Sequence, residues 1–176
     1  GSKGGITVSG GEPLLQMDFL TEFFKKAKAE GVHTNLDTSG NPFTDQEPWH
    51  SGWLELMKYT DLVMLDIKQI DEQEHIKLTG HSNKNILAMA RELSDMKKPV
   101  WIRHVLVPGG SDKDEYLHRL ADFIHTLSNV ERVEVLPYHT LGKFKWENLG
   151  LSYPLEGVNP PTQERIDNAR KILGAI

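Results

Sequence analysis

The chain has 176 residues, which is enough for one well-buried core and too short for two large domains. Its net charge of −5 and the scattered placement of Lys and Arg exclude a basic surface for nucleic acid or an anionic membrane. Because it has no cysteine and no apolar run near the roughly 18 residues of a membrane-spanning helix, we predict a cytoplasmic protein without disulfides or thiolate-bound metal in these residues.

Five short apolar runs alternate with stretches of helical periodicity. We expect strands at Ile6–Val8, Val32–Leu36, Leu62–Leu65, Val100–Val107 and Val133–Leu136. Their ends lie about 28 to 42 residues apart, which leaves room for a crossover helix after each strand. The pattern predicts an α/β fold with a parallel sheet, either doubly wound or part of a TIM-like barrel.

Apolar residues spaced three and four apart predict the helices between these strands. We expect helices over Met17–Ala27, Trp53–Lys58, Ile86–Leu93, Leu117–Leu127 and Ile166–Leu173. Gly31 is placed to end the first helix, while Ser111 and Thr162 are placed to cap the last two at their N-termini. The segment 41–52, which contains two prolines, is predicted to be a loop.

Polar residues and glycines follow or end each predicted strand. They are Ser9-Gly10-Gly11-Glu12, Asp37-Thr38, Asp66 with Lys68, and Tyr138-His139, and the fourth strand carries Arg103 within its length. Ligands of parallel α/β folds bind beyond the carboxyl ends of the strands, so these residues are the candidate site. Any single group has a plain alternative, because Gly, Asp and Ser are also common turn residues.

The glycine pair and the acidic residues each allow two interpretations. Gly10 and Gly11 either form a simple turn or let a ligand approach the backbone, with Glu12 accepting from an amine. Asp37 and Asp66 either share a proton or bind a hard cation; otherwise Asp37 caps a helix and Asp66 pairs with Lys68. Residues 66 and 68 point to the same side of an extended strand, which favours such a pair.

Two further candidates lie within the fourth predicted strand and shortly after the fifth. His139 is a possible base, hydrogen-bond donor or single metal ligand, although a lone histidine is more often structural. Arg103 lies within a strand, where a guanidinium needs a carboxylate partner.

Five strings of the sequence together resemble the pyruvate formate-lyase activating enzymes. They are Thr7-Val8-Ser9-Gly10-Gly11-Glu12-Pro13-Leu14-Leu15, Leu36-Asp37-Thr38-Ser39-Gly40, Asp61-Leu62-Val63-Met64-Leu65-Asp66-Ile67-Lys68, Trp101-Ile102-Arg103 with Val107-Pro108-Gly109, and Leu136-Pro137-Tyr138-His139. Each string alone is modest, but the five occur in order from about Gly4 to Leu173, and together they are specific.

The resemblance implies a radical S-adenosylmethionine (SAM) enzyme with a partial (β/α)6 barrel, of which about five βα units are present here. In that family a C-x3-C-x2-C loop holds a 4Fe–4S cluster, and SAM bound to it is cleaved reductively to a 5′-deoxyadenosyl radical. The radical takes a hydrogen atom from a glycine in a peptide loop of the partner lyase. The implied partners are pyruvate formate-lyase and a reductant such as flavodoxin or ferredoxin.

The resemblance also assigns residues by position. SAM contacts are implied for Gly10, Gly11, Glu12, Asp66, Ile67, Lys68, His139 and Arg103, with the first three at the methionyl amino group. A monovalent-cation site beside the SAM carboxylate is implied for Asp37, Thr38, Met64 and Asp66.

The absence of cysteine is the departure from the family pattern. We therefore expect residues 1–176 to form a single partial-barrel domain truncated at its N-terminus, with Gly1-Ser2 as a cloning remnant or a cut point. Such a fragment should not cleave SAM, should bind it weakly if at all, and should expose the edge of its first strand. The alternatives are an activase of another glycyl-radical enzyme, a non-catalytic α/β binding domain, and an acid–base enzyme using Asp37, Asp66 and His139.

Overall fold

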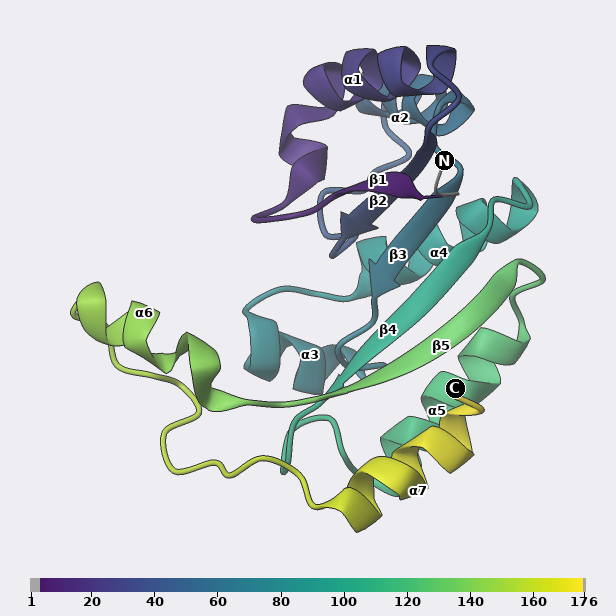
Figure 1. The fold of residues 1–176 in the computed structure, drawn as a ribbon. Helices are drawn as coiled ribbons and strands as arrows, with labels where there is room; N and C mark the ends of the chain where they lie inside the picture. Colours follow the sequence, from purple (N-terminus) through teal and green to yellow (C-terminus); the bar gives the residue numbers. More distant parts are fainter. Residues whose placement is uncertain (1–3, 176) are drawn as a thin grey trace.

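A computed structural model, which describes residues 4–175, contains one open sheet of five parallel strands. The Gly1-Ser2 pair lies outside the described residues. The strands are β1 (Gly5–Val8), β2 (His33–Thr38), β3 (Leu62–Asp66), β4 (Val100–Leu106) and β5 (Val130–Pro137). Each strand pairs with the next one in the chain, so the order never reverses as it does in a doubly wound sheet. The sheet therefore has barrel-type winding, and the predicted partial barrel is confirmed (Figure 1).

Seven α-helices and two short 3₁₀ helices connect or follow the strands of the described chain. They are η1 (Pro13–Gln16), α1 (Met17–Ala29), α2 (Trp49–Lys58), α3 (Glu72–Thr79), α4 (Lys84–Asp95), α5 (Asp114–His125), η2 (Thr140–Gly142), α6 (Lys143–Asn148) and α7 (Gln163–Leu173). Five were predicted, and α2 begins earlier than expected because the predicted loop extends only to Pro48. The pattern missed α3 and α6, since α3 buries only His75 and α6 buries no residue, which leaves no apolar stripe.

Two of the three predicted helix-end residues behave as expected. Gly31, with a φ of 71°, follows the end of α1, and the Thr162 hydroxyl accepts from the Arg165 N–H at the start of α7. The prediction for Ser111 was wrong, because α5 begins at Asp114 after Lys113. The buried Ser111 hydroxyl instead donates to the Val105 carbonyl and accepts from the Val107 N–H. It thus closes the turn after β4.

The hydrophobic core lies between the sheet and its helices, while the opposite face of the sheet carries polar side chains. On β4, burial alternates strictly, with Ile102 fully buried and Arg103 only partly buried on the other face. Leu65 of β3 and Met89 of α4 are also fully buried in the core. No described helix is long and apolar enough to cross a membrane. The polar face ends at the carboxyl edge of the strands, which is where the candidate site lies.

Candidate functional site

Arg103 is the centre of an ionic cluster at the carboxyl edge of the sheet. Its Nη2 donates to Asp37 Oδ1 at 2.7 Å, and its Nε donates to Asp66 Oδ1 at 3.0 Å. The three side chains come from β4, β2 and β3, and each is 15–18% exposed. Asp66 lies directly beside Arg103 in the β3–β4 register. Asp37 therefore pairs with a guanidinium rather than capping a helix, and Arg103 has the carboxylate partners that its place in a strand requires.

The cluster carries an excess of negative charge. Burial raises the pKa of Asp37 above its usual 3.8, and nearby Asp66 and Glu12 raise it further, against the opposing effect of Arg103. Lys68 Nζ lies 3.8 Å from Asp66 Oδ2, as the same-side spacing predicted, and its side chain is 40% exposed. The carboxylates of Asp37, Asp66 and Glu12 therefore outnumber the two cations, Arg103 and Lys68. This excess favours a ligand that brings positive charge.

The Gly10-Gly11-Glu12 segment forms an open loop fixed by its glutamate. Gly10 and Gly11 have φ values of 92° and 54°, which glycine adopts at little cost, and a Cβ at either position would meet nothing within 4 Å. Glu12 Oε1 accepts from the Leu14 N–H and the Thr38 hydroxyl, while Oε2 accepts from the Ser39 N–H and hydroxyl. Two bonds to each oxygen saturate the carboxylate, so Glu12 ties the loop after β1 to the end of β2.

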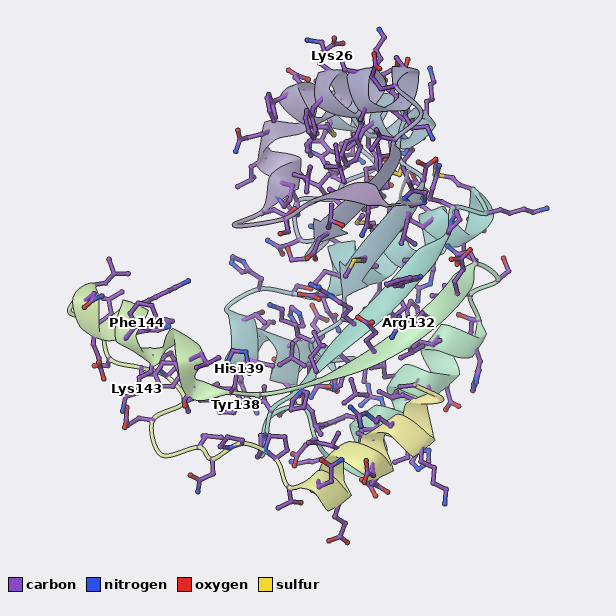
Figure 2. All side chains as sticks on the ribbon, viewed as in Figure 1. Lys26, Arg132, Tyr138, His139, Lys143 and Phe144 are labelled. Atoms are coloured by element: carbon purple, nitrogen blue, oxygen red, sulfur yellow. The ribbon has the colours of Figure 1, made fainter. Side chains whose placement is uncertain are left out.

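The remaining predicted residues differ in how closely they join the cluster. Met64 lies opposite Asp37 in the β2–β3 register, and the Thr38 hydroxyl is bonded to Glu12. Ile67 is 1% exposed, with its N–H donating to the Arg103 carbonyl. His139 is exposed after β5, where the chain turns toward α6 (Figure 2), and no described hydrogen bond or ion pair joins it to the cluster. Within residues 4–175, no three His, Asp or Glu side chains are grouped to hold a metal ion.

A pocket of about 260 Å³ opens beside this cluster, between α3 and the ends of β2 and β3. Its lining includes Asp66, Lys68, His75, His81, Ser39 and Asn41. Sequence reasoning missed the two histidines, because it did not predict α3. The available signal was Asp71, whose side chain caps α3 at its N-terminus, together with Gly80 at its C-terminus in a left-handed conformation.

Comparisons with known proteins agree with this geometry. A sequence model of the radical SAM superfamily matches residues 1–122. The pyruvate formate-lyase-activating enzymes of Streptococcus mutans and Staphylococcus epidermidis are 57% and 58% identical to the chain over 98% of its length. The chain belongs to the pyruvate formate-lyase-activating family of radical SAM proteins. It spans about two thirds of the length of these relatives, covering 66% and 68% of them.

Solved structures give the same picture of the activase-family fold. A domain of a pyruvate formate-lyase-activating enzyme from Bacteroides vulgatus superposes with a TM-score of 0.77 at 26% identity, covering 97% of this chain and 93% of that one. SuiB of Streptococcus suis, whose structure is bound to SAM, has a TM-score of 0.61 at 18% identity, over 74% of this chain and 29% of SuiB. At that identity the second likeness supports the fold alone.

The residues of this activase-family chain fit one of the family's two cofactors. No cysteine is present, so none of its residues can provide the thiolate ligands of an iron–sulfur cluster. SAM carries a sulfonium, an ammonium and a carboxylate. The excess of carboxylates, the exposed Lys68 and the unobstructed Gly10-Gly11 backbone suit a ligand with those groups.

Proposed function

We propose that this chain is the SAM-binding part of an enzyme that generates a glycyl radical on pyruvate formate-lyase. The observation that carries the proposal is the Asp37–Arg103–Asp66 cluster at the rim of a radical SAM fold whose relatives are activases. SAM supplies hydrogen-abstracting radical chemistry when it is bound to a reduced iron–sulfur cluster. The residues of this chain bind and orient it, and the sheet and helices keep water from one side of the site.

Several groups at the carboxyl edge of the sheet share the binding of SAM. The backbone of Gly10 and Gly11 receives the methionyl ammonium, since the Glu12 carboxylate is saturated and acts by holding the loop. Lys68 and Arg103 are the cations available to the SAM carboxylate. Ile67 contributes its backbone and packing. His139 approaches the nucleoside from the β5 side of the sheet.

A monovalent cation can share this rim with SAM. Arg103 uses Oδ1 of both Asp37 and Asp66, which leaves Asp37 Oδ2, and Asp66 Oδ2 at 3.8 Å from Lys68 Nζ, for a second cation. Together with the Met64 carbonyl and Thr38, these oxygens form a hard-ligand set that suits Na⁺ or K⁺. The added positive charge offsets the repulsion between the two aspartates.

The whole enzyme acts with partners that bind at the same carboxyl edge of the sheet. The partner that receives the radical is pyruvate formate-lyase, through a glycine-bearing loop, and a flavodoxin or ferredoxin provides the electron. Because this chain lacks cysteine, incubation with SAM and dithionite should yield no 5′-deoxyadenosine. We also propose that residues 1–176 form a single domain.

Titration with SAM and with S-adenosylhomocysteine, followed by NMR, tests the binding role. S-adenosylhomocysteine has a neutral thioether where SAM has a charged sulfonium. The carboxylates at the edge of the sheet should therefore bind SAM about five- to tenfold more tightly than S-adenosylhomocysteine, and this preference should fall with added salt. Asp66→Asn should reduce the preference, whereas Arg119→Met, at an exposed ion pair on α5, should not. Equal binding of both ligands, unaffected by Asp66→Asn, would contradict the proposal.

A further inference from the structure

Gln69 is a fully buried polar residue directly after Lys68, in the loop between β3 and α3. It is 0% exposed, although it belongs to neither element. Its Nε2 donates to the Gly110 carbonyl at 2.8 Å, and its Oε1 accepts from the Asp71 N–H at 3.1 Å. The side-chain amide therefore has a partner at each end and joins the β3–α3 loop to the turn after β4.

Two other buried side chains hold the same loop. On β4, His104 has its Nδ1 2.8 Å from the Ile67 carbonyl oxygen. Just before α4, the Asn83 Nδ2 donates to the Gln69 carbonyl at 3.1 Å. Both of these side chains belong to residues that are 2% exposed. Lys68 thus lies between two residues whose carbonyls are each bonded to a different part of the fold.

This concentration of buried polar groups is not explained by stability alone. Ten polar residues of the described chain are buried, and four of them lie at this loop and the adjoining turn: Gln69, Asn83, His104 and Ser111. Burying polar groups costs free energy even when they are hydrogen-bonded, and apolar packing would often fill the same space at lower cost. A bonded buried network gives one defined conformation instead. The fold therefore fixes the conformation of the loop that carries Lys68.

The fixed loop presents a cation to the candidate site. The Lys68 side chain is 40% exposed, and its Nζ lies 3.8 Å from Asp66 Oδ2. Ile67 and Gln69 on either side are buried, at 1% and 0% exposure. A lysine loses rotamer entropy when it binds an anion, and a mobile backbone would add to that loss. A backbone that is already fixed removes the second cost.

We propose that Gln69 is a positioning residue for SAM: its buried amide holds residues 67–70 against the turn at Gly110, so that Lys68 is placed to bind the SAM carboxylate. Because Gln69 is fully buried, it acts through Lys68 and does not touch the ligand. The inference rests on the proposed function, since it explains how that site is preorganised.

A double-mutant cycle on the 176-residue chain, with SAM binding followed by NMR, tests whether Gln69 acts through Lys68. Lys68→Met removes the ammonium and should weaken SAM binding about three- to tenfold in the parent. Gln69→Met keeps much of the side-chain volume but removes both hydrogen bonds. In that background Lys68→Met should weaken binding by less than about twofold. If Gln69 served the fold alone, the effect of Lys68→Met would be the same in both backgrounds.

Two further variants provide the control and the rescue. Asn129 is 9% exposed, and its Nδ2 donates to the Lys98 carbonyl at 2.6 Å, at the amino end of the sheet. Asn129→Leu should lower the urea midpoint but leave the effect of Lys68→Met as in the parent. Gln69→Glu is the conservative variant. Burial raises the pKa of a carboxyl, so at pH 5 the new side chain should be protonated, donate to Gly110 and bind SAM within about twofold of the parent at that pH.

Backbone nitrogen relaxation measures the loop without SAM. In Gln69→Met the order parameters of residues 67–70 should fall from about 0.85 toward 0.6, and in Asn129→Leu they should not. A loop that stays rigid in Gln69→Met, or an equal effect of Lys68→Met in both backgrounds, would overturn the inference and leave the proposed function intact. If the parent does not bind SAM, the proposed function fails, and the positioning role fails with it.

Discussion

Replacing Arg103 with methionine should destabilise the protein strongly at neutral pH. Arg103 contacts Asp37 at 2.7 Å and Asp66 at 3.0 Å, and all three side chains are at least four-fifths buried. Methionine preserves much of the aliphatic stem, so the change mainly removes charge and hydrogen bonds. Leaving carboxylates buried without their partner typically costs about 3–5 kcal/mol, and we expect about 3 kcal/mol here because Lys68 still faces Asp66.

The loss should depend on pH in a defined direction. The pKa of Asp37 is already raised by burial, and removing Arg103 removes the group that opposes the rise. A folded-state pKa above the unfolded one gives a contribution that is present below the unfolded value and is lost as the pH rises through the folded value. The difference in unfolding free energy between parent and variant should therefore be smaller near pH 4 than at pH 7. It should shrink by about 1.4 kcal/mol for each unit by which the substitution raises the pKa of Asp37 further.

Urea unfolding, followed by tryptophan fluorescence, measures both effects. Trp53 is fully buried, so its emission reports the loss of the core. Arg119→Met is the control, because Arg119 and Asp71 form a pair at 3.1 Å with side chains 46% and 28% exposed, which should contribute less than about 1 kcal/mol. Adding Asp37→Asn to Arg103→Met should recover part of the loss. If Arg103→Met costs no more than Arg119→Met from pH 4 to pH 8, the reasoning is refuted.

Three further predictions concern the scaffold, each measured by urea unfolding. Gly40→Ala should cost about 2–4 kcal/mol, because φ is 71° and the new Cβ would lie 2.8 Å from Leu65 Cδ1; a loss under 1 kcal/mol would contradict this. Thr162→Ala should cost about 1 kcal/mol through the lost cap of α7, and an unchanged midpoint would argue against it. Burial lowers the pKa of His104 from 6.5, so the free energy of unfolding should fall as the pH drops below 6.5. His104→Asn should reduce the slope of unfolding free energy against pH by up to about 1.4 kcal/mol per pH unit, and an identical slope in the variant would disprove this.

Local patterns in the sequence determined most of the scaffold. Apolar runs of β-branched and leucine residues located all five strands, and three-and-four spacing located the helices that bury an apolar face. The two-residue period of a strand also placed Asp66 and Lys68 on one side, where the structure has them 3.8 Å apart. These features depend on neighbours within a few positions, so sequence alone was enough to predict them.

Only the tertiary structure decided which polar groups meet. Arg103 reaches Asp37 across 66 residues of sequence because the β2–β3–β4 register and the curvature of the sheet bring them together. Packing likewise joins Glu12 to Thr38 and Ser39, so the glutamate supports the glycine loop. α3 shows no apolar stripe, so His75 and its place in the pocket beside Asp66 were visible only after folding. Hydrogen bonds between distant strands depend on register and curvature, and no local period encodes either.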